Sequence, residues 1–247
     1  MTRLPSVHLA TVGLTAGLAL CLTSARAGAF PPYRSTDAGT ADPYVLEGRL
    51  GLIRYERDAG EDGFTSPLLR VNFGLPQRIE LTTEFEYLPV EGKVGDAAAG
   101  LKWVPYFERL SLGTEALVLL PVSSAGGAGV ESQLLATQRW DSLQLHLNLG
   151  GFYDARPEPV EKGWRGSLLA ETKLGRFRPG AELFAKQVAW ASVVVQAGLG
   201  AIVTLGPIDL RTAAHFGLTD ATPDFRTSLW IAGKLPLAET EDAKAAH

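Results

Sequence analysis

Cysteine, methionine and histidine are rare in this chain, and no long hydrophobic run follows its first thirty residues. The 247 residues include one Cys, one Met and four His. Cys21, the single cysteine, lies in an apolar N-terminal stretch, so the remaining chain cannot form a disulfide framework. A transmembrane helix needs about 20 consecutive apolar residues. The sequence therefore favours neither a disulfide-stapled protein nor a helical membrane protein.

The scarcity of histidine also argues against an enzyme and against a metal centre. Beyond the N-terminal stretch, only His146, His215 and His247 remain. His146 and His215 share the parity of polar residues in predicted strands, whereas a barrel phospholipase needs a Ser–His pair on its lipid-facing side. No Cys or His occurs at metal-ligand spacing, and no glycine-rich nucleotide motif opens a helix. The sequence predicts no catalytic residue, no metal and no cofactor.

The first 27 residues have the organisation of a secretory signal peptide. Met1–His8 is short and positively charged, Leu9–Leu22 is apolar, and Ala25-Arg26-Ala27 or Ala27-Gly28-Ala29 offers small residues for cleavage. A transmembrane anchor is the alternative, but the apolar core is shorter than the about 20 residues of a span. We predict that residues 1–27 are a signal peptide and that the mature chain is exported.

The net charge argues against a nucleic-acid partner. The whole chain has a formal charge of −4, and removal of residues 1–27 takes away Arg3 and Arg26, which leaves −6. Proteins that bind nucleic acid carry a basic patch or a basic balance. Nucleic acid is therefore excluded as an expected partner.

The mature chain is dominated by an alternation of apolar and polar residues with a period of two. Within Ser142–Phe152, leucines alternate with Gln144, His146 and Asn148, which predicts a β-strand with one apolar and one polar face. About twelve stretches follow this pattern, many of them close to the roughly ten residues that a tilted strand needs to cross a bilayer. These stretches are Leu46–Leu52, Leu69–Phe73, Arg78–Tyr87, Val94–Trp103, Leu110–Leu120, Val130–Arg139, Ser142–Phe152, Trp164–Leu174, Ala181–Lys186, Val193–Val203, Ile208–Phe216 and Phe225–Leu235.

The connections between the predicted strands alternate between long and short. A sheet that crosses a bilayer repeatedly has this alternation, with tight turns on the periplasmic side and longer loops outside. The sequence thus predicts an all-β fold, an antiparallel up-and-down transmembrane β-barrel of about 12 strands, over residues 44–237. The breaks expected to be extracellular are Glu56–Gly63, Pro121–Gly129, Tyr153–Gly163 and Leu218–Asp224.

A secreted soluble β-sandwich or lipocalin-like barrel also has alternating strands. A closed sheet of about twelve strands is too wide for side chains to fill, since about eight already leave just enough room. Greek-key sandwiches do not show a strict alternation of long and short connections. Aromatic residues such as Tyr87, Trp103 and Trp164 also lie at strand ends, as in the girdles of membrane barrels. These features favour the membrane barrel.

Several short motifs resemble those of a known family. Tyr33–Thr40 (YRSTDAGT) is similar to the STDDAGT-type opening of the outer-membrane proteins named for the MetA pathway of phenol degradation. Gly95-Asp96 with Gly100-Leu101-Lys102 resembles that family's Gly-Asp…Gly-x-Lys strand, and Phe216–Asp220 resembles a later landmark. The likeness covers nearly the whole mature chain. It implies an outer-membrane β-barrel that transports aromatic or other small molecules.

Strand parity places one set of ionisable residues on the polar face, which would line the inside of a barrel. Charges are tolerated there where the lumen is wet or where they pair with one another. Two interpretations stay open, a lattice of salt bridges that holds the barrel closed and a lining that selects solutes. The mixture of both signs favours the lattice. The lumen-lining candidates are Arg49, Arg70, Glu80, Glu84, Glu86, Lys102, Glu115, Arg139, His146, Glu171, Lys173, Lys186, Arg211, His215, Arg226 and Lys234.

Two segments flank the predicted barrel. Residues 28–43 are rich in turn-forming residues and predict an ordered lead-in or a plug folded into the lumen, and residues 238–247 form a polar tail. The function predicted is an outer-membrane channel or transporter for small molecules, with apolar or aromatic solutes favoured by the resemblance. The alternatives are a closed barrel with a structural or interaction role and a secreted soluble β-sheet protein. Outer-membrane lipid and a small-molecule solute are the expected partners, and the oligomeric state stays open.

Overall fold

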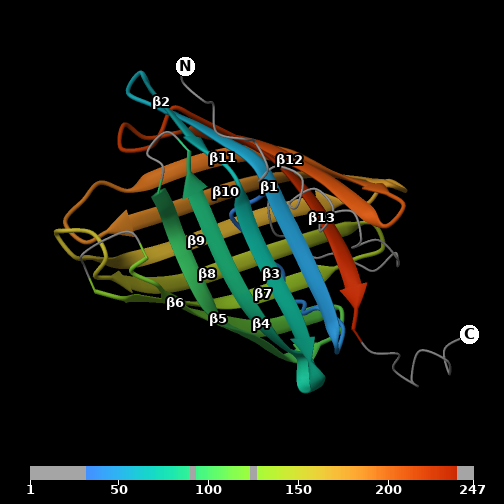
Figure 1. The fold of residues 1–247 in the computed structure, drawn as a ribbon. Coiled ribbons are helices and arrows are strands. Elements are labelled where there is room, and N and C mark those ends of the chain that lie inside the picture. Colours follow the sequence, from blue (N-terminus) through green and yellow to red (C-terminus); the bar gives the residue numbers. More distant parts are fainter. Residues whose placement is uncertain (1–31, 90–92, 123–126, 238–247) are drawn as a thin grey trace, which may run out of the picture.

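The computed structural model describes residues 32–89, 93–122 and 127–237 (Figure 1). The predicted signal peptide, the first residues of the lead-in and the polar tail lie outside the described residues. Within the described part, no helix has the length and hydropathy needed to cross a membrane. The strands are β1 Val45–Asp58, β2 Glu61–Thr65, β3 Leu68–Leu75, β4 Ile79–Leu88, β5 Lys93–Phe107, β6 Leu110–Leu119, β7 Gly129–Arg139, β8 Leu143–Asp154, β9 Glu161–Thr172, β10 Phe177–Val188, β11 Val194–Leu205, β12 Ile208–Gly217 and β13 Phe225–Pro236, with a short 3₁₀ turn, η1, at Pro76–Arg78.

The strands form one closed antiparallel ring. Each pairs with its neighbour in the chain, and β13 pairs with β1 to close the sheet. The two short strands β2 and β3 pair with successive parts of β1 and together make one strand of the ring, interrupted at Ser66-Pro67. The result is a closed barrel of 12 strands, which confirms the predicted all-β up-and-down architecture.

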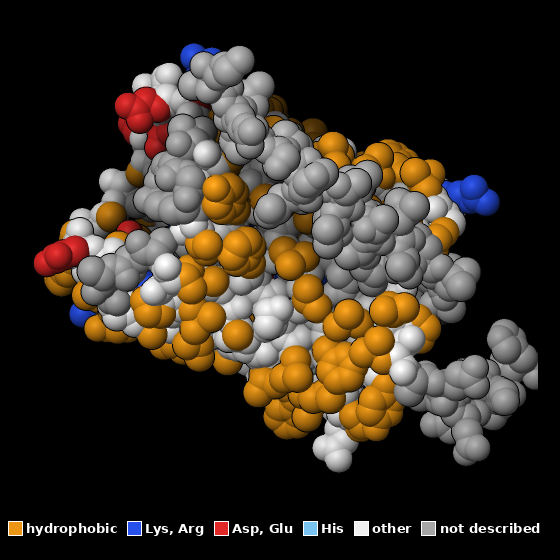
Figure 2. Space-filling model, viewed as in Figure 1, with side chains coloured by type: hydrophobic (Ala, Val, Ile, Leu, Met, Phe, Trp, Pro, Cys, Tyr) orange, Lys and Arg blue, Asp and Glu red, His pale blue; other side chains and the backbone are white. Residues whose placement is uncertain are grey.

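Polar side chains point into the barrel and apolar side chains point out. Along β7, buried Gln133, Leu135 and Thr137 alternate with more exposed neighbours, and Leu134 on the outer face is 67% exposed. Figure 2 shows hydrophobic side chains gathered over the outer surface of the strands that face the viewer. This pattern is the reverse of a soluble barrel, whose apolar side chains fill the inside, so the structure argues against the soluble alternative.

The predicted long loop Glu56–Gly63 is wrong, because β1 and β2 extend through it as a hairpin with a two-residue turn. Asp58 pairs with Glu61, and the turn residues Ala59 and Gly60 both have positive φ angles of 49° and 88°. A two-residue turn of this kind matches the right-handed twist of the flanking strands. Across the hairpin, the Tyr55 hydroxyl donates to Asp62 Oδ1 at 2.6 Å. The acidic residues of this stretch, Glu56, Asp58, Glu61 and Asp62, are therefore part of paired strands.

Most of the other connections follow the predicted alternation of lengths, although those at residues 89–92 and 173–176 have four residues each. The tight ones, at η1 and at residues 108–109, 140–142, 173–176 and 206–207, share one end of the barrel with the start of β1 and the end of β13. The connections at the opposite end span residues 89–92, 120–128, 155–160, 189–193 and 218–224. We name these two ends the short-turn end and the long-loop end.

A charge placed on the outer face should destabilise the barrel if that face contacts lipid. Leu134 lies at the middle of β7 and is 67% exposed. We expect Leu134→Arg to lower the free energy of unfolding by about 2–4 kcal/mol in lipid vesicles, because a charge near the midplane of a bilayer is costly. Leu174→Arg, at an exposed position in the β9–β10 turn, serves as the matched control and should change it by about 0–1 kcal/mol. Equal effects of the two substitutions would contradict a lipid-facing outer surface.

Cysteine labelling on intact cells should reveal the orientation. The single native cysteine, Cys21, lies in the predicted signal peptide, so an introduced cysteine provides a unique label. Ala221→Cys lies in the exposed connection at the long-loop end and Gln77→Cys in the exposed turn at the short-turn end. We expect an impermeant maleimide to label the first and not the second. The opposite result would invert the orientation.

Candidate functional site

The inside of the barrel contains a segment of the chain that precedes the first strand. Residues 32–41 pass through the ring before β1 begins, and Figure 1 shows this stretch in blue between the barrel walls. Most of its residues are buried, including Tyr33, Ser35, Thr36 and Ala38. We call residues 32–41 the luminal segment. Among the described residues, no backbone–backbone hydrogen bond joins this segment to a strand, so side chains of the barrel wall must provide its hydrogen bonds.

Glu182 on β10 holds the beginning of the luminal segment. Its carboxylate accepts hydrogen bonds from the backbone amides of Arg34 at 3.0 Å and Ser35 at 2.6 Å. The Ser35 hydroxyl donates to the same carboxylate at 2.5 Å, and His215 Nε2 on β12 lies 2.7 Å from it. One buried carboxylate therefore joins two wall strands to the segment.

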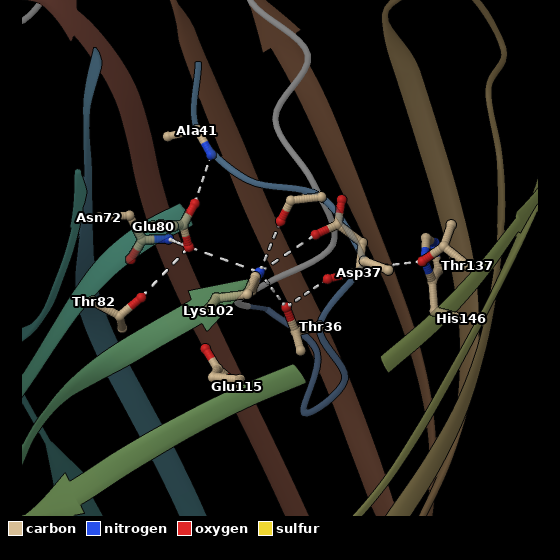
Figure 3. Close-up of polar contacts among 12 residues, drawn as sticks. Thr36, Asp37, Ala41, Asn72, Glu80, Thr82, Lys102, Glu115, Thr137 and His146 are labelled. Carbon is tan, nitrogen blue, oxygen red and sulfur yellow. Dashed lines mark hydrogen bonds and ion pairs between the residues drawn. The ribbon is translucent and has the colours of Figure 1, made fainter. Parts of the chain in front are cut away.

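Neutral side chains of β7 and β8 hold the middle of the luminal segment. Asn148 accepts from the Thr36 amide at 2.7 Å and donates to the Thr36 carbonyl at 2.8 Å, which is the pairing that a neighbouring strand would provide. Thr137 Oγ1 accepts from the Ala38 amide at 2.8 Å and lies 3.0 Å from His146 Nδ1. His146 Nε2 in turn lies 3.2 Å from the Glu171 carboxylate. Figure 3 shows Thr137 and His146 side by side.

Lys102 on β5 is the centre of the contacts near the end of the luminal segment (Figure 3). Its ammonium group donates to Thr36 Oγ1 at 3.0 Å and to the Gly39 carbonyl at 3.1 Å. Carboxylate oxygens of Glu80 and Asp37 lie 3.7 and 3.8 Å away. Glu80 also accepts from the Ala41 amide at 2.6 Å. Lys102 is only 1% exposed, so these partners replace the water that would otherwise stabilise its ammonium group.

Two contacts show how closely the segment fits the wall. A side chain at Gly74 on β3 would place its Cβ 2.5 Å from the carbonyl oxygen of Ala41, the last residue of the segment, and 2.0 Å from that of Asp42, so only glycine allows this approach. Tyr33 packs against the buried Leu169, Ile202 and Ala213 of three wall strands.

A cavity of about 380 Å³ lies inside the barrel beside the beginning of the luminal segment. We call it the interior cavity. Its lining combines ionisable groups with inward-facing apolar side chains, among which Phe184 and Trp230 are 2% and 8% exposed. A pocket of this size and mixed lining can hold a small organic molecule.

The structure places most of the predicted lumen-lining residues inside the barrel, where many are paired. Arg70 pairs with Glu115 at 2.9 Å and also with Glu84, and Lys234 pairs with Glu47 at 2.5 Å. The fully buried members are Arg49, Arg70, Glu80, Lys102, Glu115, His146, Glu171, Arg211, His215 and Lys234. The partly exposed members are Glu84, Glu86, Arg139, Lys186 and Arg226.

Lys173 is the exception among the predicted lumen-lining residues. β9 ends at Thr172, so Lys173 lies in the exposed turn to β10 and not on an inward strand position. Strand parity carries no information once the strand has ended.

The sequence did not identify several interior residues that the structure brings together. Thr137 and Gln196 are neutral and are not among the lumen-lining candidates, although Thr137 shares the strand parity of Arg139. The sequence places Asn148 on the polar face of its strand, and the structure buries it. Arg54 points inward and pairs with Glu86 at 2.5 Å because the pairing of β1 with β13 shifts between Gly51 and Ile53. This bulge reverses the parity that the sequence alone predicts for Arg54.

Among the described residues, no cluster of three or more His, Cys, Asp or Glu side chains could hold a metal ion.

The fold is shared with outer-membrane channels of known structure. No protein-family model matches the chain. No curated protein matches it either. An outer-membrane channel from Pseudomonas putida F1 is similar with a TM-score of 0.61 and 10% identity, over 81% of this chain and 98% of that channel. The NanC porin is similar with a TM-score of 0.57 and 10% identity, over 77% of this chain and 100% of the porin. At this identity the likeness concerns the fold, and the resemblance to the family named for the MetA pathway stays a prediction.

Proposed function

We propose that this chain is a passive outer-membrane channel for small solutes and that residues 28–43 act as a plug within it. The observation that carries the proposal is a closed barrel, apolar outside and polar inside, that encloses both a hydrogen-bonded segment and a cavity. An apolar outer band with a polar interior is the arrangement of barrels that span outer membranes. The shared fold of the channel and the porin supports the same conclusion.

The proposed solutes are small molecules with apolar or aromatic parts. Inward-facing Phe152, Phe184 and Trp230 line the interior cavity together with Leu68 and Leu117. Aromatic and aliphatic walls with a few polar groups are typical of sites for small organic molecules. The resemblance to the proteins named for the MetA pathway of phenol degradation points to the same solute class.

Ion selectivity is expected to be weak. Cations and carboxylates inside the barrel are paired, as in Arg165 with Glu131 at 2.7 Å and Lys186 with Glu161 at 3.4 Å. Paired charges of both signs produce little net field along a pore.

A closed barrel with a structural role is the second candidate. It is favoured by the number of wall groups that bind the luminal segment, including Glu182, Asn148, Thr137 and Lys102. This arrangement would fill the lumen permanently if the segment never moved.

Planar-bilayer conductance and liposome uptake distinguish the two candidates. The mature chain is refolded in detergent, its folding is checked by heat-modifiable gel mobility, and it is then inserted into bilayers. The channel proposal expects discrete conductance steps and uptake of small solutes. Correctly folded protein with neither conductance nor uptake, with or without residues 28–40, would favour the structural role. Recovery of the native protein from the periplasm without detergent would contradict the outer-membrane location.

A further inference from the structure

Arg34 differs from the other cations that line the interior cavity. Seven Arg or Lys residues line this cavity, and six of them pair with a carboxylate. The pairs are Arg54 with Glu86, Arg70 with Glu84 and Glu115, Arg156 with Asp154, Arg165 with Glu131, Lys186 with Glu161, and Arg226 with Glu56. Arg34 has no salt bridge among the residues that the structure describes. It is therefore the lining cation whose charge is not matched by a carboxylate contact.

The side-chain contacts of Arg34 are with neutral groups. Its Nη1 donates to Gln196 Oε1 at 3.2 Å, and its guanidinium carbon lies 3.9 Å from the centre of the Phe184 ring. A guanidinium has five N–H donors in a planar fork, so these contacts leave donors for a ligand. The side chain is partly exposed and lines the cavity.

The charges that surround Arg34 leave it attractive to an anion. The positive charges of Arg226 and Arg165 and the carboxylates of Glu182 and Glu56 all act on its guanidinium. However, Glu182 already accepts hydrogen bonds from backbone amides of the luminal segment, and Glu56 pairs with Arg226. A ligand carboxylate would complete the contacts of Arg34.

An apolar surface lies in the same cavity as this cation. Phe152 and Leu119 line the cavity and are partly exposed, whereas Phe184, Trp230, Leu68 and Leu117 line it with only 2%, 8%, 2% and 6% of their surface exposed. Exposed apolar side chains turned towards the inside of a barrel gain nothing from lipid, so Phe152 and Leu119 are available to an apolar ligand. Flat aromatic rings contribute large contact areas in such sites.

We propose that the interior cavity is a binding site for a small organic monoanion with a planar apolar body, of the aromatic carboxylate class. The Arg34 guanidinium would bind the carboxylate, and Phe152 and Leu119 would contact the ring. The inference rests on the proposed channel function, since it assigns a solute class to the same interior.

Binding to the folded protein tests this site without any measurement of transport. Isothermal titration calorimetry of the mature protein in detergent is performed with benzoate, with neutral benzamide, with cationic benzylammonium and with acetate, which lacks the ring. We expect benzoate to bind about tenfold or more tightly than each of the others, as charge-assisted hydrogen bonds and apolar burial both contribute. Benzylammonium or acetate binding as tightly as benzoate would overturn the proposal. Because this series uses the unmodified chain, it does not depend on the folding of a variant.

A pair of arginine variants locates the site. Arg34→Gln should weaken benzoate binding about tenfold, because it removes the charge while keeping a polar side chain. Arg78→Gln is the matched control, since Arg78 also lies over a ring, 5.1 Å from the centre of Phe107, but does not line the cavity. Unchanged benzoate affinity in the folded Arg34→Gln variant would overturn the proposal.

The outcomes for the site and for the channel are separable. Benzoate binding that depends on Arg34, in a protein without conductance or uptake, would support the site and contradict the channel. Conductance and uptake in a protein that does not bind benzoate would support the channel and overturn the site.

Discussion

Deletion of Gly28–Thr40 is expected to raise the single-channel conductance of the folded barrel severalfold. In the native chain, the luminal segment occupies the interior and bonds to Glu182, Asn148 and Lys102 on three different wall strands. An empty barrel of about twelve strands is too wide for its own side chains to fill. Removal of the segment therefore leaves a water-filled path where the native protein has packed backbone.

Two comparisons control for indirect effects of the deletion. Trp190→Ala alters a fully exposed residue of the β10–β11 connection and should leave the conductance unchanged. Replacement of residues 32–40 by a glycine–serine chain of equal length keeps the backbone of the segment but removes its side-chain contacts, and it should give noisy, intermittent currents. Equal conductance of the native and deleted proteins would contradict a plug role for residues 28–43.

Substitution of Lys102 by Met is expected to cause the largest loss of stability of any single replacement considered for the interior. Lys102 is 1% exposed, and its ammonium group lies near the carboxylates of Glu80 and Asp37. Removing one partner of a buried ionic group leaves the others uncompensated, at a cost of about 3–5 kcal/mol. The measurement is the free energy of unfolding in urea, in detergent micelles or lipid vesicles.

The control and a double variant determine where that cost arises. Lys173→Met, in an exposed turn, should change the free energy of unfolding by about 0.5 kcal/mol or less. In the background that lacks Gly28–Thr40, Lys102→Met should cost less than in the full mature chain, because Thr36, Asp37 and Gly39 are then absent. An equal cost in both backgrounds would show that Lys102 stabilises the wall and not the luminal segment.

The barrel itself was predictable from the sequence because the pattern that produces it lies within each strand and its adjoining turns. Alternation of apolar and polar residues sets the two faces of each strand, as in β8, where His146 and Asn148 face inward and Leu147 and Leu149 face outward. The connection lengths then indicate up-and-down order. Neither inference needs the positions of residues that are distant in the chain.

Features that depend on distant contacts were not predictable in this way. The hairpin at Ala59-Gly60 forms because β1 has a pairing partner on each side. The bulge near Leu52 turns the Arg54 side chain inward. A period of two in the sequence indicates neither feature. The hydrogen-bond partners of the luminal segment are separated from it by up to 162 residues, as for Arg34 and Gln196. Only the closed ring brings them together.

The location of the luminal segment is tested most directly by a disulfide between it and the inner wall. The Ala38 amide lies 2.8 Å from Thr137 Oγ1 on β7. The double variant Ala38→Cys with Thr137→Cys is folded in lipid vesicles, oxidised, and analysed for a mobility shift that a reducing agent reverses. Ala38→Cys with Leu134→Cys is the control, since Leu134 lies on the outer face of the same strand. We predict a cross-link in the first pair and none in the second. Absence of a cross-link between positions 38 and 137 in the folded protein would contradict an N-terminal segment bound inside the barrel.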